Sequence, residues 1–276
     1  MLSTDPGLGL NTSIQDAHNI AWKLALIIKG KAHHSLTKTY ETERRPIGVQ
    51  TADWGLFTFS NFQVLQSAVG LIPGQKDYNQ MRFTRLFEKS EYGETMRHQL
   101  RRLIATQDIE FQAHGIEMDI RYEENAATVH DGTPAPERDP LGKTYIPTTR
   151  PGHRIPHAWI ESRGVVVSTH DLVGTDDFLV ITDETGGPWL AAASQICQSR
   201  GLKIRAIGIK SRRHVPATGD IYTDRDDQWV GVRGIEDGGA VLVRPDNMVA
   251  WRNREPSKHG GKELIEAISA ILGKRS

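Results

Sequence analysis

Residues 7–24 read GLGLNTSIQDAHNIAWKL, in which a glycine turn leads directly into a strong helical pattern. Apolar side chains then recur at the spacing of three and four residues that lines one face of a helix. They are Ile14, Ala17, Ala21, Leu24 and Ile28. The pattern therefore predicts a helix with one apolar face over residues 14–28.

The ends of this helix carry their own signals. Thr12 and Gln15 form a capping-box pair at its start, and Gly30 is typical of its end. The first amides of a helix have no partner within it, and they attract negative charge. Taken alone, the turn is an ordinary glycine loop in most proteins, because it lacks the third glycine of a dinucleotide fingerprint, the lysine of a P-loop and a preceding strand.

A second helix is predicted from about residue 35 to residue 45, with Pro46 forcing its end or a kink. Mostly helical sequence follows it. There, an apolar stripe among arginines predicts a surface helix and carries no chemistry of its own. The stripe consists of Met96, Leu100, Leu103 and Ile104.

Prolines, glycines and threonines gather between residues 125 and 150, and this change in composition predicts a domain boundary. Beyond it, an apolar run at residues 164–167 is followed by a buried strand at 178–181, a helix at 188–200 and a strand at 202–209. This β-α-β order predicts a parallel pair of strands.

The end of the chain changes pattern again. Residues 240–243 and 248–251 flank Arg244-Pro245-Asp246-Asn247, which is hairpin chemistry, because proline presets φ and asparagine tolerates a left-handed conformation. A last amphipathic helix is predicted over residues 264–272. Strand, helix, strand, hairpin and helix is the order of a thioredoxin-like fold.

Residues 9–24, followed by Tyr40 and by residues 43–46, resemble the end of the FAD domain in class A flavoprotein monooxygenases. The phenol and 2,4-dichlorophenol hydroxylase branch is the nearest likeness. A second set of motifs is similar to the C-terminal thioredoxin-like domain of that branch. It comprises Arg150-Pro151-Gly152, Pro156-His157, Ser168-Thr169-His170-Asp171-Leu172 and residues 243–252.

The resemblance implies an α/β chain with two domains. Residues 1–135 would be the helical end of a Rossmann-like FAD-binding domain, and residues 136–276 a thioredoxin-like domain without a CxxC pair. It also implies FAD as cofactor, NADH or NADPH as co-substrate, and transfer of one oxygen atom of O2 to a phenolic or other aromatic substrate.

In that family the glycine turn passes under the flavin ring, so the resemblance implies that the amides of Leu10 and Asn11 point at the pyrimidine oxygen O2. Such amides would stabilise the negative charge that reduction places around N1 and O2. The cofactor-binding residues implied in this way are Gly7, Leu8, Gly9, Leu10, Asn11 and Thr12. No side chain is given a catalytic or metal-binding role.

Several motifs of the family are absent from the sequence. They are the GxGxxG turn for the ADP pyrophosphate, the acidic residue for the ribose, the Asp-Gly motif associated with the nicotinamide nucleotide, and the Gly-Asp pair for the ribityl chain. We therefore expect a truncated gene model or a split gene. On its own, the chain is expected neither to hold FAD tightly nor to turn over.

Several conspicuous side chains are interpreted as structural. His18 and Trp22 lie one helical turn apart, and core packing is favoured over stacking on a ligand ring. Glu43 and Arg44 are expected to form ion pairs that anchor the second helix, as in the family. Cys197 has no CxxC partner, so disulfide exchange is not expected.

The composition of the chain limits the classes of partner that it is expected to bind. The 34 lysines and arginines balance 34 aspartates and glutamates, so neither nucleic acid nor an anionic membrane surface is an expected partner. No apolar run approaches the roughly 18 to 20 residues needed to span a bilayer. The single cysteine and the absence of a signal-peptide pattern predict a cytoplasmic protein.

Two other functions compete with the hydroxylase. One is a noncatalytic module, in which the thioredoxin-like domain and its helical arm mediate dimerisation, so a homodimer is an expected assembly. The other is a thiol oxidoreductase, which the single cysteine excludes unless it acts between chains.

Overall fold

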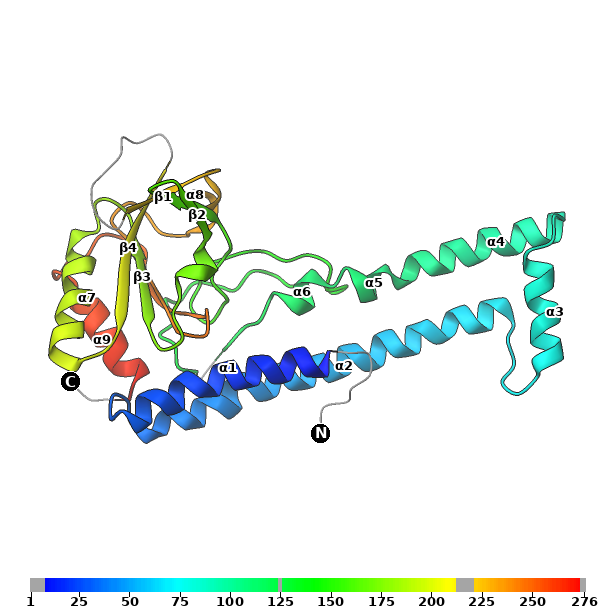
Figure 1. The fold of residues 1–276 in the computed structure, drawn as a ribbon, viewed down its shortest axis with the longest axis horizontal. Helices are drawn as coiled ribbons and strands as arrows, with labels where there is room; N and C mark the ends of the chain where they lie inside the picture. The colour runs from blue at the N-terminus through cyan, green and yellow to red at the C-terminus, as the bar shows by residue number, and fades with distance from the viewer. Residues whose placement is uncertain (1–7, 124–125, 212–220, 274–276) are drawn as a thin grey trace. The chain divides into compact units, whose positions relative to one another are not determined.

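The computed structural model describes residues 8–123, 126–211 and 221–273 (Figure 1). Contacts group the chain into two compact units. Unit 1 consists of Met1–Ser13, Ile47–Glu117 and Arg138–Tyr145, and unit 2 of Ile14–Pro46, Met118–Glu137 and Ile146–Ser276. The predicted division into domains after residue 135 stays a prediction.

The described residues of unit 2 form a mixed sheet of seven strands in the order β2-β1-β5-β4-β3-β6-β7. The predicted parallel pair is confirmed, because Val180 of β3 lies opposite Ala206 of β4. The predicted hairpin is also confirmed as antiparallel β6 and β7, with Asn247 at a φ of 64°. The strands are β1 (Trp159–Ser162), β2 (Val165–Ser168), β3 (Phe178–Thr182), β4 (Ile204–Ser211), β5 (Ile221–Asp224), β6 (Ala240–Val243) and β7 (Val249–Asn253).

Both faces of the central strand β3 of this sheet are buried. Phe178 and Val180 of β3 point into one apolar cluster with α7 (Gly187–Arg200) and α9 (Lys262–Ile271), whereas Leu179 and Ile181 point into a second cluster that includes Trp229 of α8 (Gln228–Val232). A central strand covered on both sides reads as a continuous apolar run, which is why the sequence predicted a buried strand there. Along the chain, β3, α7, β4, the β6–β7 hairpin and α9 follow one another in the predicted order of a thioredoxin-like fold, which is confirmed.

The first helix, α1, spans Gly9–Ile28, so the start predicted at Thr12 is wrong. Thr12 lies inside the first turn, where its hydroxyl donates to the carbonyl of Leu8 at 2.9 Å. A threonine that bonds backward to the preceding turn can lie within a helix, and its side chain then does not cap the helix. The predicted end is confirmed, because Gly30 has a φ of 65° just beyond the helix.

The face of α1 that packs against unit 2 is not its apolar stripe. Trp22 and Leu26 are buried in the core of unit 2 together with the polar residues Asn19 and Lys23. The stripe from Ile14 to Ile28 is exposed instead. Trp22 packs as predicted, but His18 is exposed, so its predicted burial is wrong. The spacing showed a stripe correctly, but spacing alone cannot show which face a neighbouring element covers.

Of the end or kink predicted at Pro46, the end is wrong. After a short 3-10 turn, η1 (His34–Thr37), helix α2 runs from Lys38 to Val69 with Pro46 inside it. A proline removes one hydrogen bond of a helix, and here that loss does not stop the helix.

Unit 1 contains most of the remaining helices. They are α3 (Lys76–Leu86), α4 (Glu91–Ile104), η2 (Ala105–Gln107), α5 (Asp108–Phe111) and α6 (His114–Glu117). The surface helix predicted around Met96 is confirmed as α4, whose stripe is partly exposed. Within the described ranges, no helix of either unit is long and apolar enough to cross a membrane.

Candidate functional site

The start of α1 contains five of the six residues predicted to bind the cofactor; Gly7 lies outside the described residues. Gly9, the first residue of the helix, is buried, whereas the side chains of Leu10 and Asn11 are exposed. Leu8 precedes the helix and is partly buried. The exposed side of the first turn of α1 is therefore formed by Leu10 and Asn11.

The polar side chains of this first turn are already bonded locally. The hydroxyl of Thr12 donates to Leu8, and that of Ser13 donates to the carbonyl of Gly9 at 2.9 Å. What the turn can offer a ligand is its main chain, because the amides of the first helical turn have no acceptor within the helix. The amides of Leu10 and Asn11 belong to this turn, and the positive end of the helix dipole adds to them.

A buried cluster of charges fixes the middle of α1. Lys23 and Glu43 form an ion pair at 2.7 Å with both side chains fully buried. Asn19 donates to Glu43 at 2.6 Å and accepts from Lys23 at 2.8 Å. The ion pairs expected of Glu43 and Arg44 are thereby confirmed, since Arg44 bonds Asp16 at 2.7 Å.

Arg244, from the end of β6, completes the cluster. Its guanidinium donates to both oxygens of Glu43, at 2.7 and 2.8 Å, and to both oxygens of Asp246, at 2.9 and 2.5 Å. The same group lies close to two aromatic rings, 5.0 Å from the centroid of Trp22 and 5.2 Å from that of Tyr122. Two bidentate carboxylate pairs and two ring faces satisfy a fully buried arginine.

The protonation of this cluster follows from burial and from its opposite charges. Burial, and then Arg244, lower the pKa of Lys23 to about 8. Burial alone would raise the pKa of Glu43, but Arg244 and Lys23 outweigh it and hold this pKa at about 2. Burial raises the pKa of Tyr122 to about 12, so its hydroxyl stays protonated at neutral pH.

Sequence reasoning missed most of this cluster. Asn19 and Lys23 stand at helical positions next to Trp22, and their burial has no signature in the spacing of apolar residues. Arg244 and Asp246 stand in the predicted hairpin turn, where the hairpin pattern by itself indicates a turn and gives no sign of an ion pair with the first two helices. One signal was available in the sequence. The turn between two apolar strands is rich in charges, and the first helix carries lone polar residues next to Trp22. Because buried charges need partners, these two segments could have been expected to pair.

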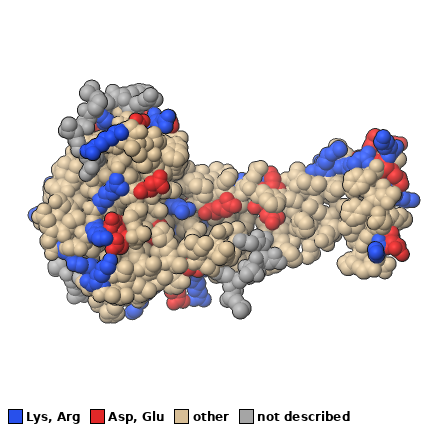
Figure 2. Space-filling view, in the orientation of Figure 1, with Lys and Arg blue, Asp and Glu red and all other residues tan. Residues whose placement is uncertain are grey.

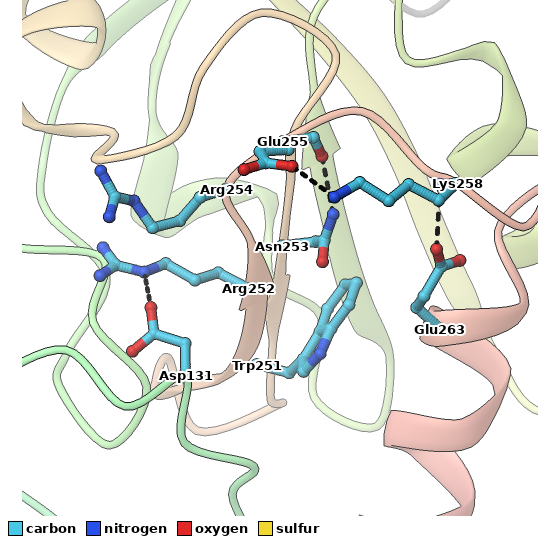
Figure 3. Close-up of a pocket in the computed structure, with 8 residues that line it drawn as sticks. All are labelled: Asp131, Trp251, Arg252, Asn253, Arg254, Glu255, Lys258 and Glu263. Carbon is cyan, nitrogen blue, oxygen red and sulfur yellow. Dashed lines mark hydrogen bonds and ion pairs between the residues drawn. The ribbon is translucent and has the colours of Figure 1, made fainter.

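A pocket of about 380 Å³ lies next to β7 in unit 2 (Figure 3). Arg252 donates to Asp131 at 2.5 Å, and Lys258 pairs with Glu255 at 2.8 Å, so most of its charges neutralise one another. This pairing leaves no strong field, and we give the pocket no part in the flavin site. It is lined by Asp131, Trp251, Arg252, Asn253, Arg254, Glu255, Lys258 and Glu263.

The face of the molecule drawn in Figure 2 carries charges of both signs. Figure 2 shows Lys and Arg interspersed with Asp and Glu, in agreement with the zero net charge of the sequence. Across the three described ranges, no group of three or more His, Cys, Asp or Glu side chains could hold a metal ion. Cys197 donates its thiol hydrogen to the carbonyl of Ile204 at 3.6 Å.

Comparison with known families separates the chain into two matched regions. Residues 2–55, which contain α1, match a family described as FAD binding domain. Residues 148–274 match a family described as aromatic-ring hydroxylase, C-terminal.

Individual relatives match nearly the whole chain. The 2,4-dichlorophenol 6-monooxygenase of Delftia acidovorans is 37% identical over 269 residues, which cover 96% of this chain and 44% of the relative. The phenol 2-monooxygenase of Pseudomonas sp. (strain EST1001) is 34% identical, over 95% of this chain and 42% of the relative. The chain thus spans less than half the length of these relatives.

Solved structures agree with the sequence comparisons. The flavin-dependent monooxygenase PieE, in complex with FAD and substrate, superposes with a TM-score of 0.83 at 35% identity. The match covers 99% of this chain and 46% of PieE. Aklavinone-11 hydroxylase, in a ternary complex with FAD and aklavinone, gives a TM-score of 0.68 at 26% identity over 99% of this chain and 42% of its own.

Proposed function

We propose, from the premise that this chain belongs to the FAD-dependent aromatic-ring hydroxylases and corresponds to their C-terminal portion, that it supplies one edge of a flavin site. The whole enzyme would hydroxylate a phenolic or other aromatic substrate with NAD(P)H and O2. The observation that carries this proposal is the exposed first turn of α1, which lies within the segment matched to the FAD binding domain.

The residues at this turn suit a flavin edge. FAD, when bound, supplies the redox and oxygen chemistry. The amides of Leu10 and Asn11 would donate to O2 of the isoalloxazine, and the positive end of α1 would stabilise negative charge there without rearrangement. Gly7 and Gly9 would allow the ring to approach the main chain, while Leu8 and Thr12 hold the turn through their hydrogen bond.

The wider assignments follow from the same premise. The substrate would be a small aromatic molecule that binds beside FAD, as aklavinone does in the ternary complex of aklavinone-11 hydroxylase. We further infer that the complete protein acts in the cytoplasm and forms a homodimer.

A fused protein tests the proposed function. The polypeptide of the Delftia relative that precedes its matched region would be joined to this chain, and bound flavin would be measured by its absorbance. Oxidation of NADH and NADPH would be followed with phenol and 2,4-dichlorophenol, together with the hydroxylated product. A folded fusion that binds no flavin, or that binds flavin and hydroxylates no phenol, would contradict the proposal.

A further inference from the structure

The outer face of α1 is apolar, exposed and continuous within unit 2. Ile14 is 59% exposed, Leu24 42% and Ile28 83%, and Ala17 and Ala21 are exposed between them. In Figure 1, α1 is the dark blue helix. Contiguous exposed apolar surface of this kind marks an interaction site in soluble proteins.

The stripe cannot be buried by rotating the helix. Trp22 is 1% exposed and packs edge-on against Phe178 of β3, with 5.8 Å between ring centroids. At about 100° per residue, the buried and exposed faces of α1 lie about 180° apart. Turning the stripe inward would expose Trp22 and break the buried Lys23–Glu43 pair, so α1 has two faces that both require cover.

The chemistry of the stripe describes what covers it. No charge interrupts it, because Lys23 is buried and Asp16 bonds Arg44 at the side of the helix. Ala17 and Ala21 lie at its centre, where small side chains allow a neighbouring main chain to approach closely. Ile14, Leu24 and Ile28 lie around them as larger side chains, each worth roughly 1.5–3 kcal/mol when buried. The partner surface is therefore apolar and uncharged.

In unit 1, taken by itself, large apolar side chains are also exposed. Among its described residues, only four apolar side chains are buried, and large side chains such as Leu56, Phe57 and Phe111 are exposed. The four are Ile47, Val69, Leu86 and Ala113. A unit of this size with so few buried apolar groups has no core sufficient for its own stability, which points to a large partner.

We infer that the stripe of α1 is the docking face for the remainder of the FAD-binding domain, whether that polypeptide is continuous with this chain or separate. The FAD-binding match contains α1 but extends only over residues 2–55. The Delftia relative has more than half of its length outside the region matched by this chain. The apolar stripe of a helix must be buried against another element, either a sheet or a second helix, and the unmatched part of the relatives is long enough to supply one.

A second copy of this chain suits the stripe less well. The stripe from residue 14 to residue 28 is about 21 Å long at 1.5 Å per residue. Two copies joined only through their stripes would fall short of the roughly 800 Å² that a stable interface buries on each partner, whereas a partner larger than the stripe can extend beyond it. The identity of the partner rests on the proposed function, whereas the need for cover rests on the exposed stripe alone.

Cysteine labelling tests the inference without using activity. In a Cys197→Ala background, Leu24→Cys places one thiol on the stripe, and Val165→Cys places a control thiol on β2, where Val165 is 61% exposed. Maleimide labelling would be timed in this chain alone and in its fusion to the preceding polypeptide of the Delftia relative. We expect labelling at position 24 to slow by at least about tenfold in the fusion, while labelling at position 165 stays unchanged.

Co-expression of the two polypeptides as separate chains gives a second measure. The tagged Delftia polypeptide should retain the wild-type chain and Val165→Glu but lose Leu24→Glu, although Leu24→Glu leaves the Tm of the chain alone unchanged. Equal labelling at position 24 in both proteins, or equal retention of Leu24→Glu, would overturn the inference. Protection in the chain alone that disappears on dilution would assign the stripe to a second copy. Protection without flavin binding would keep the inference and reject the proposed function.

Discussion

Arg244 and Glu43 face each other through two parallel hydrogen bonds of 2.7 and 2.8 Å, although 201 residues separate them in the chain. Glu43 lies in the region matched to the FAD binding domain, and Arg244 in the region matched to the C-terminal part of ring hydroxylases. The pair is fully buried and Glu43 also bonds Lys23. The last hairpin of the sheet and the first two helices are thus parts of one core.

Replacement of Arg244 should show how much of the free energy of unfolding depends on this residue. Arg244→Met leaves Glu43 and Asp246 with fewer cations in a buried site, and breaking a buried pair costs about 3–5 kcal/mol. Urea unfolding of the chain measures the loss. Arg45→Met is the matched control, because Arg45 forms an exposed pair with Glu41 and such pairs are worth about 0–1 kcal/mol. Equal losses in the two variants would contradict a structural role for Arg244.

Acid should destabilise the chain through Glu43. Its pKa is about 2 in the folded chain against the usual 4.5, so between these values the unfolded state binds more protons. This contribution to stability is therefore present above pH 4.5 and is lost as the pH falls towards 2. Glu43→Gln should lower stability at neutral pH and flatten the acid loss, measured by urea unfolding at a series of pH values. Glu41→Gln, at an exposed site, should keep the wild-type slope.

Alkaline pH should stabilise the chain through Lys23, so the slope of stability against pH has the same sign as for Glu43. Burial and Arg244 bring its pKa to about 8 from the usual 10.5, so between these values the unfolded state again binds more protons. Because the charged form is disfavoured in the folded chain, this group makes stability rise as the pH increases through that window. Lys23→Met should remove the rise, whereas Lys29→Met, at a half-exposed site, should retain it.

Gly152 should not tolerate a side chain. It has a φ of 88°, and a Cβ there would collide with the carbonyl of Tyr122. Gly152→Ala should therefore cost more than the roughly 1–2 kcal/mol that a left-handed conformation alone costs an L-residue. Gly30→Ala is the control, since Gly30 has a φ of 65° with open space around it. Thermal unfolding of both variants separates the collision from the backbone cost.

If the first turn of α1 binds flavin, then loss of a single main-chain amide from this turn should alter both the reduction potential of the flavin and kcat. In the fused protein, Leu10→Pro deletes one main-chain donor in the first turn, where a helix tolerates proline, and Gly9 before it has no Cβ to clash. The flavin should become harder to reduce, and kcat should fall by about 10²-fold, as for loss of one oxyanion donor. Leu10→Ala keeps the amide and should retain the flavin potential. An unchanged potential in Leu10→Pro would remove this amide from the flavin edge.

The sequence predicted the elements whose signal is local. The residues of β3 from Phe178 to Ile181 are all apolar because both faces of the strand are covered, and the turn at Asn247 needs a residue that tolerates positive φ. The exposed stripe of α1 and the burial of Lys23 could not be predicted in this way, because each depends on which neighbour covers which face. Likewise, Pro46 shows a lost hydrogen bond and not whether the helix continues past it.

The cluster around Arg244 also limits how such proteins can recombine. A crossover anywhere between residues 46 and 118 would take Lys23 and Glu43 from one parent and Tyr122, Arg244 and Asp246 from the other. The buried charges of the chimera would be paired only if the residues from one parent were complementary to those from the other at these positions. We therefore expect the gene segments that encode the two matched regions to have been inherited together during evolution.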